Sequence, residues 1–229
     1  MWTVKVVGLG LVAVSLSLEL LDRFLRRLRS GRTRNEVLFF PSEVACVEHL
    51  FSPSHYSSFC SFPHSVETSF SRLLRCILSA TSSLDICVFA FSNMDLYRAV
   101  LALHNRGVII RVLADKDYTA IPGSQIWSLR YSGICVRCGV GSVYMHHKFA
   151  VVDHRLLITG SLNWTLTAVQ SNMENVLITE EPELVQPFIK EFHRLWECSD
   201  PARLHCAIDQ KPADCLAVTD TEVELMTEL

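Results

Sequence analysis

The 229-residue sequence predicts an α/β protein in which helices flank a mixed sheet, with one membrane anchor helix at the N-terminus. Between residues 66 and 197, segments with helical periodicity alternate with apolar runs of strand length, which is the pattern of an α/β layer. Hydrophobic residues make up 49% of the chain and charged residues 20%. This composition supports one sizeable core and excludes a disordered chain.

The uncharged stretch at residues 6–18 predicts a transmembrane signal anchor over residues 1–22. With the residues before it, the stretch approaches the ~20 residues that cross a bilayer. Arginines follow in a basic juxtamembrane neck, residues 23–40, and such positive flanks stay in the cytosol, so we expect the rest of the chain to face the cytosol. A cleaved signal peptide is the alternative, but its charge would precede the apolar run. The pattern is typical of single-pass anchors of the mitochondrial outer membrane, with the endoplasmic reticulum as the alternative location.

The net charge of −3 is unevenly distributed. Residues 1–35 hold seven Lys and Arg against two acidic residues, whereas residues 197–229 hold two against eight. This distribution argues against a uniformly basic coat for nucleic acid. The tail at residues 198–229 is acidic and lacks apolar periodicity, which predicts disorder.

Residues 41–66 predict a zinc-binding insertion. Nine cysteines, an odd number, in a chain expected to face the cytosol do not indicate a disulfide framework. If residues 42–51 are helical, Cys46 and His49 lie three positions apart on one face of the helix. The loop that follows could fold back and bring Cys60 and His64 to the same metal ion. His55 is a competing ligand, and a surface loop with buried thiols is the alternative. The candidate ligands of the C-x2-H-x10-C-x3-H pattern are Cys46, His49, Cys60 and His64.

The catalytic domain is predicted at residues 67–197, where the first elements alternate regularly. Apolar residues at helical spacing behind Ser and Glu predict a helix over residues 65–80, and an apolar run predicts a strand over residues 83–92. A second helix over residues 93–107 ends at a glycine, and a second buried strand covers residues 108–115.

A short helix at residues 122–133 and a strand at residues 134–138 follow. Cys135 and Cys138 resemble a chelating pair, but residues three apart on a strand point to opposite faces. We therefore expect them to be buried thiols.

The remaining elements contain most of the polar residues of interest. Residues 143–153 and 155–161 predict two paired strands, followed by a helix over residues 164–171 and a strand over residues 174–180. Residues 182–198 predict a closing helix that begins with proline.

The paired strands bring donors and nucleophiles together. Residues two apart on a strand share a face, so His146 and Lys148 project together while His147 projects the other way. By the same rule, Ser161 and Asn163 share a face at the end of the returning strand. An imidazole, an ammonium, a hydroxyl and an amide suit a substrate with its own negative charge, and phosphate is the obvious one.

The pattern His146-x-Lys148-x4-Asp153-x6-Gly160-Ser161-x-Asn163 resembles the HKD signature of the phospholipase D superfamily, with every signature position filled. The resemblance implies a phospholipase D-like fold over more than half of the chain. Larger members carry two copies that share one active site, whereas this chain has one HKD motif. The resemblance therefore implies a homodimer in which both copies of His146 meet one phosphate.

The resemblance also implies the role of each residue. One His146 attacks phosphorus to form a phosphohistidine, and the second protonates the leaving oxygen. Lys148 and Asn163 hold the non-bridging oxygens, and Ser161 adds a hydrogen bond. Glu174 matches the acidic residue that fixes the imidazole tautomer. Asp153 lies on the strand face opposite His146, so we expect it to orient the turn rather than to take part in the chemistry.

The substrate class is left open between two readings that the resemblance implies. The first is a single-strand-specific endoribonuclease acting on piRNA precursors at the mitochondrial surface, and the alternative is a phospholipase D that hydrolyses cardiolipin to phosphatidic acid. The absence of a second apolar stretch near the site favours the nuclease, whereas an inactive membrane scaffold conflicts with the complete signature. Catalysis needs no cofactor in either reading, and zinc would be structural. Four basic residues are expected in segments that border the site, with a solvated face of the protein as the alternative: Arg111, Lys116, Arg130 and Arg137.

Overall fold

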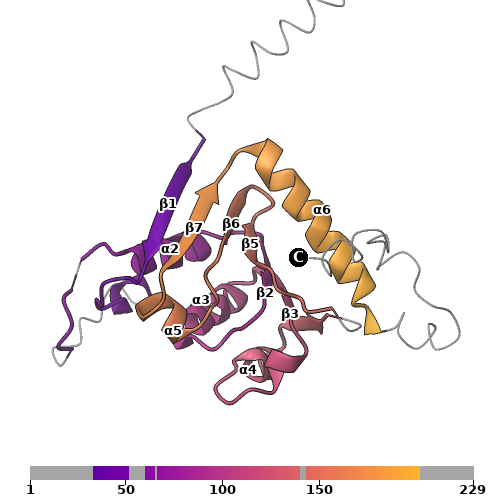
Figure 1. The fold of residues 1–229 in the computed structure, drawn as a ribbon, viewed down its shortest axis with the longest axis horizontal. Coiled ribbons are helices and arrows are strands. Elements are labelled where there is room, and N and C mark those ends of the chain that lie inside the picture. Colours follow the sequence, from indigo (N-terminus) through magenta and orange to yellow (C-terminus); the bar gives the residue numbers. More distant parts are fainter. Residues whose placement is uncertain (1–32, 52–59, 65, 140–142, 202–229) are drawn as a thin grey trace, which may run out of the picture. The chain divides into compact units, whose positions relative to one another are not determined.

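A computed structural model describes residues 33–51, 60–64, 66–139 and 143–201 (Figure 1). The chain divides into two compact units, Met1–Arg34 and Asn35–Leu229. The predicted anchor, most of the neck and nearly all of the acidic tail lie outside the described residues. Within the described ranges, no helix is both long enough and apolar enough to cross a membrane.

One mixed sheet of seven strands organises the second unit, as the sequence predicts. Its order is β1-β7-β6-β5-β2-β3-β4. The strands β2, β3 and β4 are parallel, and every other neighbouring pair is antiparallel. Their bounds are Asn35–Phe40 (β1), Ser83–Val88 (β2), Ile109–Ala114 (β3), Cys135–Cys138 (β4), Lys148–Val152 (β5), Leu156–Gly160 (β6) and Glu174–Thr179 (β7).

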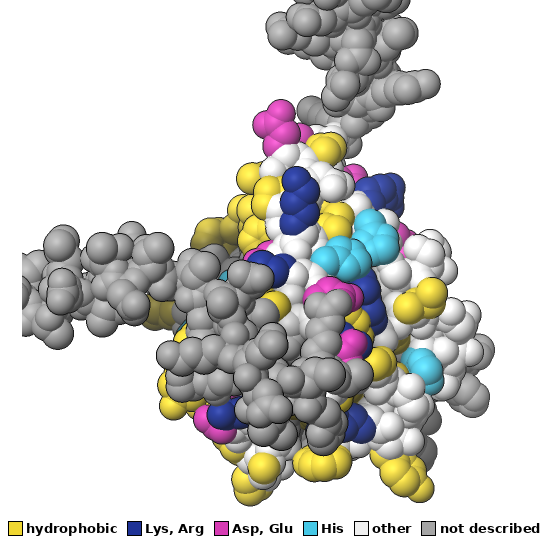
Figure 2. Space-filling view, turned by 90° about the vertical axis from the view of Figure 1, so that its right-hand side faces the viewer, with side chains coloured by type: hydrophobic (Ala, Val, Ile, Leu, Met, Phe, Trp, Pro, Cys, Tyr) yellow, Lys and Arg dark blue, Asp and Glu magenta, His cyan; other side chains and the backbone are white. Residues whose placement is uncertain are grey.

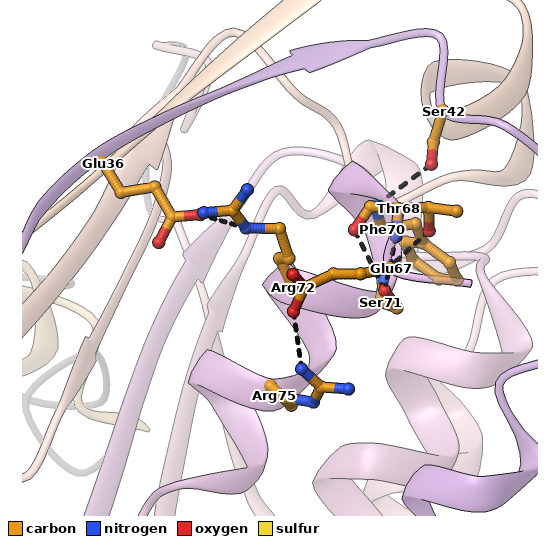
Figure 3. Close-up of polar contacts among 8 residues, drawn as sticks. All are labelled: Glu36, Ser42, Glu67, Thr68, Phe70, Ser71, Arg72 and Arg75. Carbon is orange, nitrogen blue, oxygen red and sulfur yellow. Dashed lines mark hydrogen bonds and ion pairs between the residues drawn. The ribbon is translucent and has the colours of Figure 1, made fainter. Parts of the chain in front are cut away.

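Side chains cap the starts of three of the described α-helices. The Thr68 side chain accepts the Ser71 backbone N–H and completes a capping box (Figure 3). The Asn93 side chain accepts the backbone N–H groups of Asp95 and Leu96 and caps the next helix. The α-helices are Ser69–Leu78 (α2), Met94–Asn105 (α3), Ile126–Tyr131 (α4), Leu166–Gln170 (α5) and Pro182–Cys198 (α6), with 3-10 turns at Glu48–Leu50 (η1) and Asp117–Thr119 (η2).

Two apolar clusters cover the two faces of the sheet. All of β2 is buried, because Leu84, Ile86 and Val88 pack with α2 and α3 while Cys87 packs with α6. Figure 1 shows α6 on one side of the sheet and α2 and α3 on the other. This three-layer arrangement leaves the strand ends free to carry functional side chains.

Strand β1 is an element that the sequence analysis missed, because its residues fall in the segment assigned to the basic neck. Leu38 and Phe40 are buried and Phe39 is exposed, as expected for one half-buried strand. An ion pair of 2.6 Å between Glu36 and Arg72 links β1 to α2 (Figure 3). The six residues of β1 follow a run of arginines and give only a weak strand signal in the sequence. The strand forms because its backbone pairs with β7.

Two local predictions are wrong. Residues 42–51 are not a helix, because only the 3-10 turn η1 forms, and the Cys46 N–H donates instead to the Pro63 carbonyl at 2.9 Å. Cys135 is exposed and Cys138 is half-buried rather than buried, because β4 is an edge strand of the sheet.

Candidate active site

Five of the six predicted catalytic residues meet at one edge of the sheet. Because β5 is antiparallel to both β2 and β6, the start of β5 lies beside the ends of its two neighbours. The start of β7 lies there as well, since Gly160 pairs with Val176. The residues at this edge are His146, Lys148, Ser161, Asn163 and Glu174.

The Lys148 ammonium lies directly against the His146 imidazole. Its Nζ atom is 2.9 Å from Nδ1 and 3.1 Å from Nε2, and it donates to the His146 carbonyl at 2.8 Å. Strand β5 begins at Lys148, so His146 precedes the strand, yet the two side chains meet on one face. Burial lowers the pKa of Lys148, and the charge of Glu174 opposes that effect. In this arrangement the exposed imidazole can attack a phosphate while the neighbouring ammonium holds the phosphate oxygens.

His147 has a different environment from His146. Its ring packs edge-on against Phe149, with 5.5 Å between the centroids, and its Nε2 lies 3.7 Å from Glu191 of α6. Burial lowers the pKa of His147, and Glu191 partly opposes this shift. This histidine therefore belongs to the packing between the sheet and α6.

Glu174 is engaged by residues other than His146. Its carboxylate accepts hydrogen bonds from the Ser161 hydroxyl and, at 3.0 Å, from the Asn172 amide. Ser161 in turn accepts the Asn175 N–H at 3.1 Å. Within the described part of the chain, no hydrogen bond joins Glu174 to His146, so the expected contact with the imidazole is not made in a single chain.

Asn163 is held in place by its neighbours in sequence. Leu162 and Trp164 are buried, and the Trp164 N–H donates to the Ala90 carbonyl at 3.0 Å. The Asn163 Oδ1 atom is buried without a hydrogen-bond partner among the described residues, which costs free energy. Gly160 is required nearby, because a Cβ there would lie 2.0 Å from the Asn175 carbonyl oxygen.

Asp153 lies at the other end of β5 and does not touch the other site residues. Its carboxylate accepts hydrogen bonds from the backbone N–H groups of Thr81, Ser82 and Ser83. It also accepts hydrogen bonds from the Thr81 and Ser82 hydroxyls, and all of these distances are 2.8 to 3.2 Å. Burial alone would raise the pKa of Asp153, but the backbone bonds from Ser83 and Ser82 outweigh it and hold the pKa well below its usual range. The carboxylate thus ties the turn between β5 and β6 to the start of β2.

Two of the basic residues expected to border the site are engaged by other residues of the chain. Arg111 donates to both oxygens of the buried Asp85, at 2.7 and 2.6 Å, because β2 and β3 pair these positions. Arg137 bonds the Trp196 carbonyl and Asp200. The Arg111 guanidinium also lies over the Phe192 and Trp196 rings of α6, and the Arg137 guanidinium lies over Trp196, so both side chains pack between the sheet and α6. Their expected place beside the site stays a prediction. Seen from the right-hand side of Figure 1, acidic, basic and histidine side chains are interspersed rather than separated (Figure 2).

Three of the four predicted metal ligands come together. The ligand atoms of Cys46, Cys60 and His64 all lie within 4.8 Å of one another. His49 is not in this group, although its Nδ1 atom is buried without a partner. Burial raises the pKa of the Cys46 thiol, and His55 lies outside the described residues. Two thiols and an imidazole at this separation fit zinc, which prefers sulfur and nitrogen donors in a tetrahedron.

Comparisons with known proteins identify the family. The family model described as "Cardiolipin synthase, PLD-like domain" matches residues 73–196, more than half of the chain. The chain belongs to the phospholipase D superfamily. The chain is 62% identical over 204 residues to the mitochondrial cardiolipin hydrolase of Danio rerio, covering 87% of this chain and 89% of that protein. It is 51% identical over 208 residues to the protein of the same name in Homo sapiens, covering 87% and 82%.

Two solved structures share the fold, and one of them, Nuc, is described as a phospholipase D family member. Nuc from Salmonella typhimurium aligns with a TM-score of 0.57 at 22% identity, over 72% of this chain and 95% of that one. NucT from Helicobacter pylori gives a TM-score of 0.56 at 22% identity, over 72% and 97%. The mixed sheet flanked by helices is therefore the phospholipase D fold.

Proposed function

We propose that this phospholipase D superfamily hydrolase cleaves phosphodiesters through a phosphohistidine on His146, with cardiolipin as a substrate. The observation that supports it is the contact between His146 and Lys148 in a chain with close relatives named mitochondrial cardiolipin hydrolase. Two copies of the chain share one site, since each supplies a single HKD motif. This proposal favours cardiolipin as the substrate, whereas the sequence alone favours RNA.

The reaction proceeds in two displacements. A neutral His146 attacks phosphorus, so a P–N bond forms while the P–O bond to the leaving group breaks. The partner's His146, protonated, gives its proton to the leaving oxygen. It then takes a proton from water, which attacks the phosphohistidine and restores the first imidazole. With cardiolipin, this sequence of steps releases phosphatidic acid.

Lys148 and Asn163 stabilise the charge that develops on the non-bridging oxygens. Lys148 is held by the His146 carbonyl before substrate arrives, and the chain at Asn163 is anchored through the Trp164 N–H. Removing one such donor costs about 3 kcal/mol of barrier. Two imidazoles that face one anion bind their first proton more readily than the second, so the apparent pKa values belong to the pair. Because the two apparent pKa values differ, the two identical histidines can act as one base and one acid.

The proposed setting is the mitochondrial outer membrane, with the catalytic domain in the cytosol. The names of the relatives support the organelle, and the arginines after residues 6–18 support the orientation. Protease added to intact mitochondria should digest the catalytic domain. A domain that stays intact until the outer membrane is opened would contradict the orientation.

The substrate proposal is tested with the full chain in lipid vesicles. We expect cardiolipin in the vesicles to yield phosphatidic acid, and His146→Asn to abolish the yield while leaving the fold unchanged. Single-stranded RNA is assayed in parallel on the same preparations. Wild-type protein that cleaves RNA but leaves cardiolipin intact would reject the lipid as a substrate.

An endoribonuclease acting on single-stranded RNA, such as a piRNA precursor, is the second candidate. Tyr144 supports it, because this side chain is 64% exposed two residues before His146. Its ring lies edge-on to Phe89, with 6.3 Å between the centroids. Exposed aromatic rings bind single strands by stacking on bases, whereas an acyl chain offers no flat partner.

Replacing Tyr144 therefore separates the two candidates. We expect Tyr144→Ala to slow RNA cleavage about tenfold, because stacking contributes about 1–3 kcal/mol per base. Tyr144→Phe, which keeps the ring, should retain cleavage. The measurement is kcat/KM for a single-stranded oligonucleotide beside the rate of cardiolipin hydrolysis. Equal losses on both substrates would remove the support that Tyr144 gives to the nuclease.

We further propose that Cys46, Cys60 and His64 hold a structural zinc ion. We expect about one zinc per purified chain, and Cys60→Ser should lose the metal and lower the melting temperature. Cys135→Ser is the matched control, because Cys135 is exposed and lies outside the cluster. Brief EDTA treatment should leave turnover intact, since a histidine is the nucleophile. Protein that is fully folded without zinc would contradict the proposal.

A further inference from the structure

Phe89 is placed beside the site by the pairing of β2 with β5. It follows the last residue of β2, and its N–H donates to the His147 carbonyl at 3.0 Å. This bond continues the strand pairing one step beyond Lys148, so the Phe89 backbone is fixed relative to His146. The amino-acid sequence does not point to this residue, because only the pairing of the two strands brings it to the site.

The Phe89 ring contacts both groups that carry the chemistry. Its centroid lies 4.4 Å from that of the His146 imidazole, at 59° between the planes. The Lys148 Nζ atom lies over the same ring, 5.1 Å from the centroid. Tyr118 packs against Phe89 with 4.0 Å between centroids and so supports the ring from the η2 segment.

Among the described residues of its own chain, the His146 side chain has little other support. Its hydrogen-bonding contacts are with Lys148, and Glu174 is occupied by Ser161 and Asn172. An exposed imidazole on a chain segment before a strand can rotate unless something packs against it. Misplacing a nucleophile by about 1 Å can cost a hundredfold in rate.

We propose that Phe89 is a positioning residue that holds the His146 imidazole and the Lys148 ammonium in the geometry for attack on phosphorus. This inference rests on the proposed function of His146 as nucleophile. Phe89 does not touch the phosphodiester in this role. It acts through the two groups that do, and its flat ring fits both at once.

Lys148 gives this role a signature in the pH dependence. The groups that face its ammonium are the His146 ring, the Phe89 ring and the charge of Glu174. An aromatic face favours the charged form of an amine, whereas burial lowers the pKa of Lys148. Removing the ring therefore lowers that pKa further. With bis(4-nitrophenyl) phosphate, whose nitrophenolate leaves without a proton from the partner's His146, activity should therefore fall at a lower pH on the alkaline side.

The test uses the full chain and bis(4-nitrophenyl) phosphate, a small phosphodiester without acyl chains or nucleobases. We expect Phe89→Leu to lower kcat about tenfold or more with KM changed little, and to move the alkaline limb of the pH profile to lower pH. Phe89→Tyr, which keeps the ring, should restore both. Phe188→Leu is the matched control, because Phe188 of α6 packs on Phe149 on the other face of the sheet.

The outcomes separate this inference from the proposed function. Wild-type kcat and an unmoved alkaline limb in Phe89→Leu would overturn the positioning role. A wild-type protein without activity, or one whose activity survives His146→Asn, would instead overturn the proposed function. Phe89→Met replaces Phe89→Leu if the leucine variant does not fold, as judged by circular dichroism, and the same two results decide.

Discussion

A dimer of one wild-type chain and one His146→Asn chain is expected to be nearly inactive. Such a dimer keeps either the nucleophile or the acid at the shared phosphate but never both. Removing one member of a catalytic pair that acts as a unit costs almost as much as removing the whole pair. The measurement is the activity of the heterodimer, isolated after co-expression of the two chains with different tags.

A mixing series gives the same answer without isolation of the heterodimer. With a fraction f of mutant chains and random assembly, shared sites predict activity in proportion to (1 − f) squared, whereas independent sites predict (1 − f). When half of the chains are mutant, about a quarter of the activity should remain rather than about a half. A heterodimer with half of the wild-type activity would show that each chain works alone.

Replacing Asp153 by Asn is expected to produce a large loss of stability, about 3 kcal/mol. The carboxylate accepts all of its bonds from N–H and O–H donors of Thr81, Ser82 and Ser83. An amide places an NH2 group against some of these donors and leaves them unpaired. Asp95→Asn is the control, since Asp95 forms a surface ion pair with Arg98 and should cost under about 1 kcal/mol.

The loss at Asp153 should depend on pH in one direction. The pKa of this carboxyl is lower in the folded protein than in the unfolded chain, so folding gains from its charge at pH values above about 4. That gain is lost as pH falls below about 4, where the unfolded chain takes up the proton first. The difference in unfolding free energy between wild type and Asp153→Asn should therefore shrink from pH 6 to pH 3. A difference that stays constant would rule out the charge as its source.

The fold class and the order of most elements can be predicted from the amino-acid sequence. Alternating helical and extended patterns predict the mixed α/β sheet, and the closing helix at Pro182–Cys198 is predicted to the residue. The HKD spacing predicts that His146 and Lys148 share a face, because side chains alternate along an extended chain. These features depend on the spacing of residues within a single helix or strand, so the sequence of that segment is enough to predict them.

Only the tertiary structure decided which residues meet across the sheet. Phe89 reaches His146 because β2 pairs with β5, and Arg111 meets Asp85 because β2 pairs with β3. The partners of Glu174 and the course of the chain around Cys46 likewise depend on contacts between segments far apart in sequence. A strand's own pattern gives its two faces but not its neighbours, since register and order are set by packing of the whole sheet.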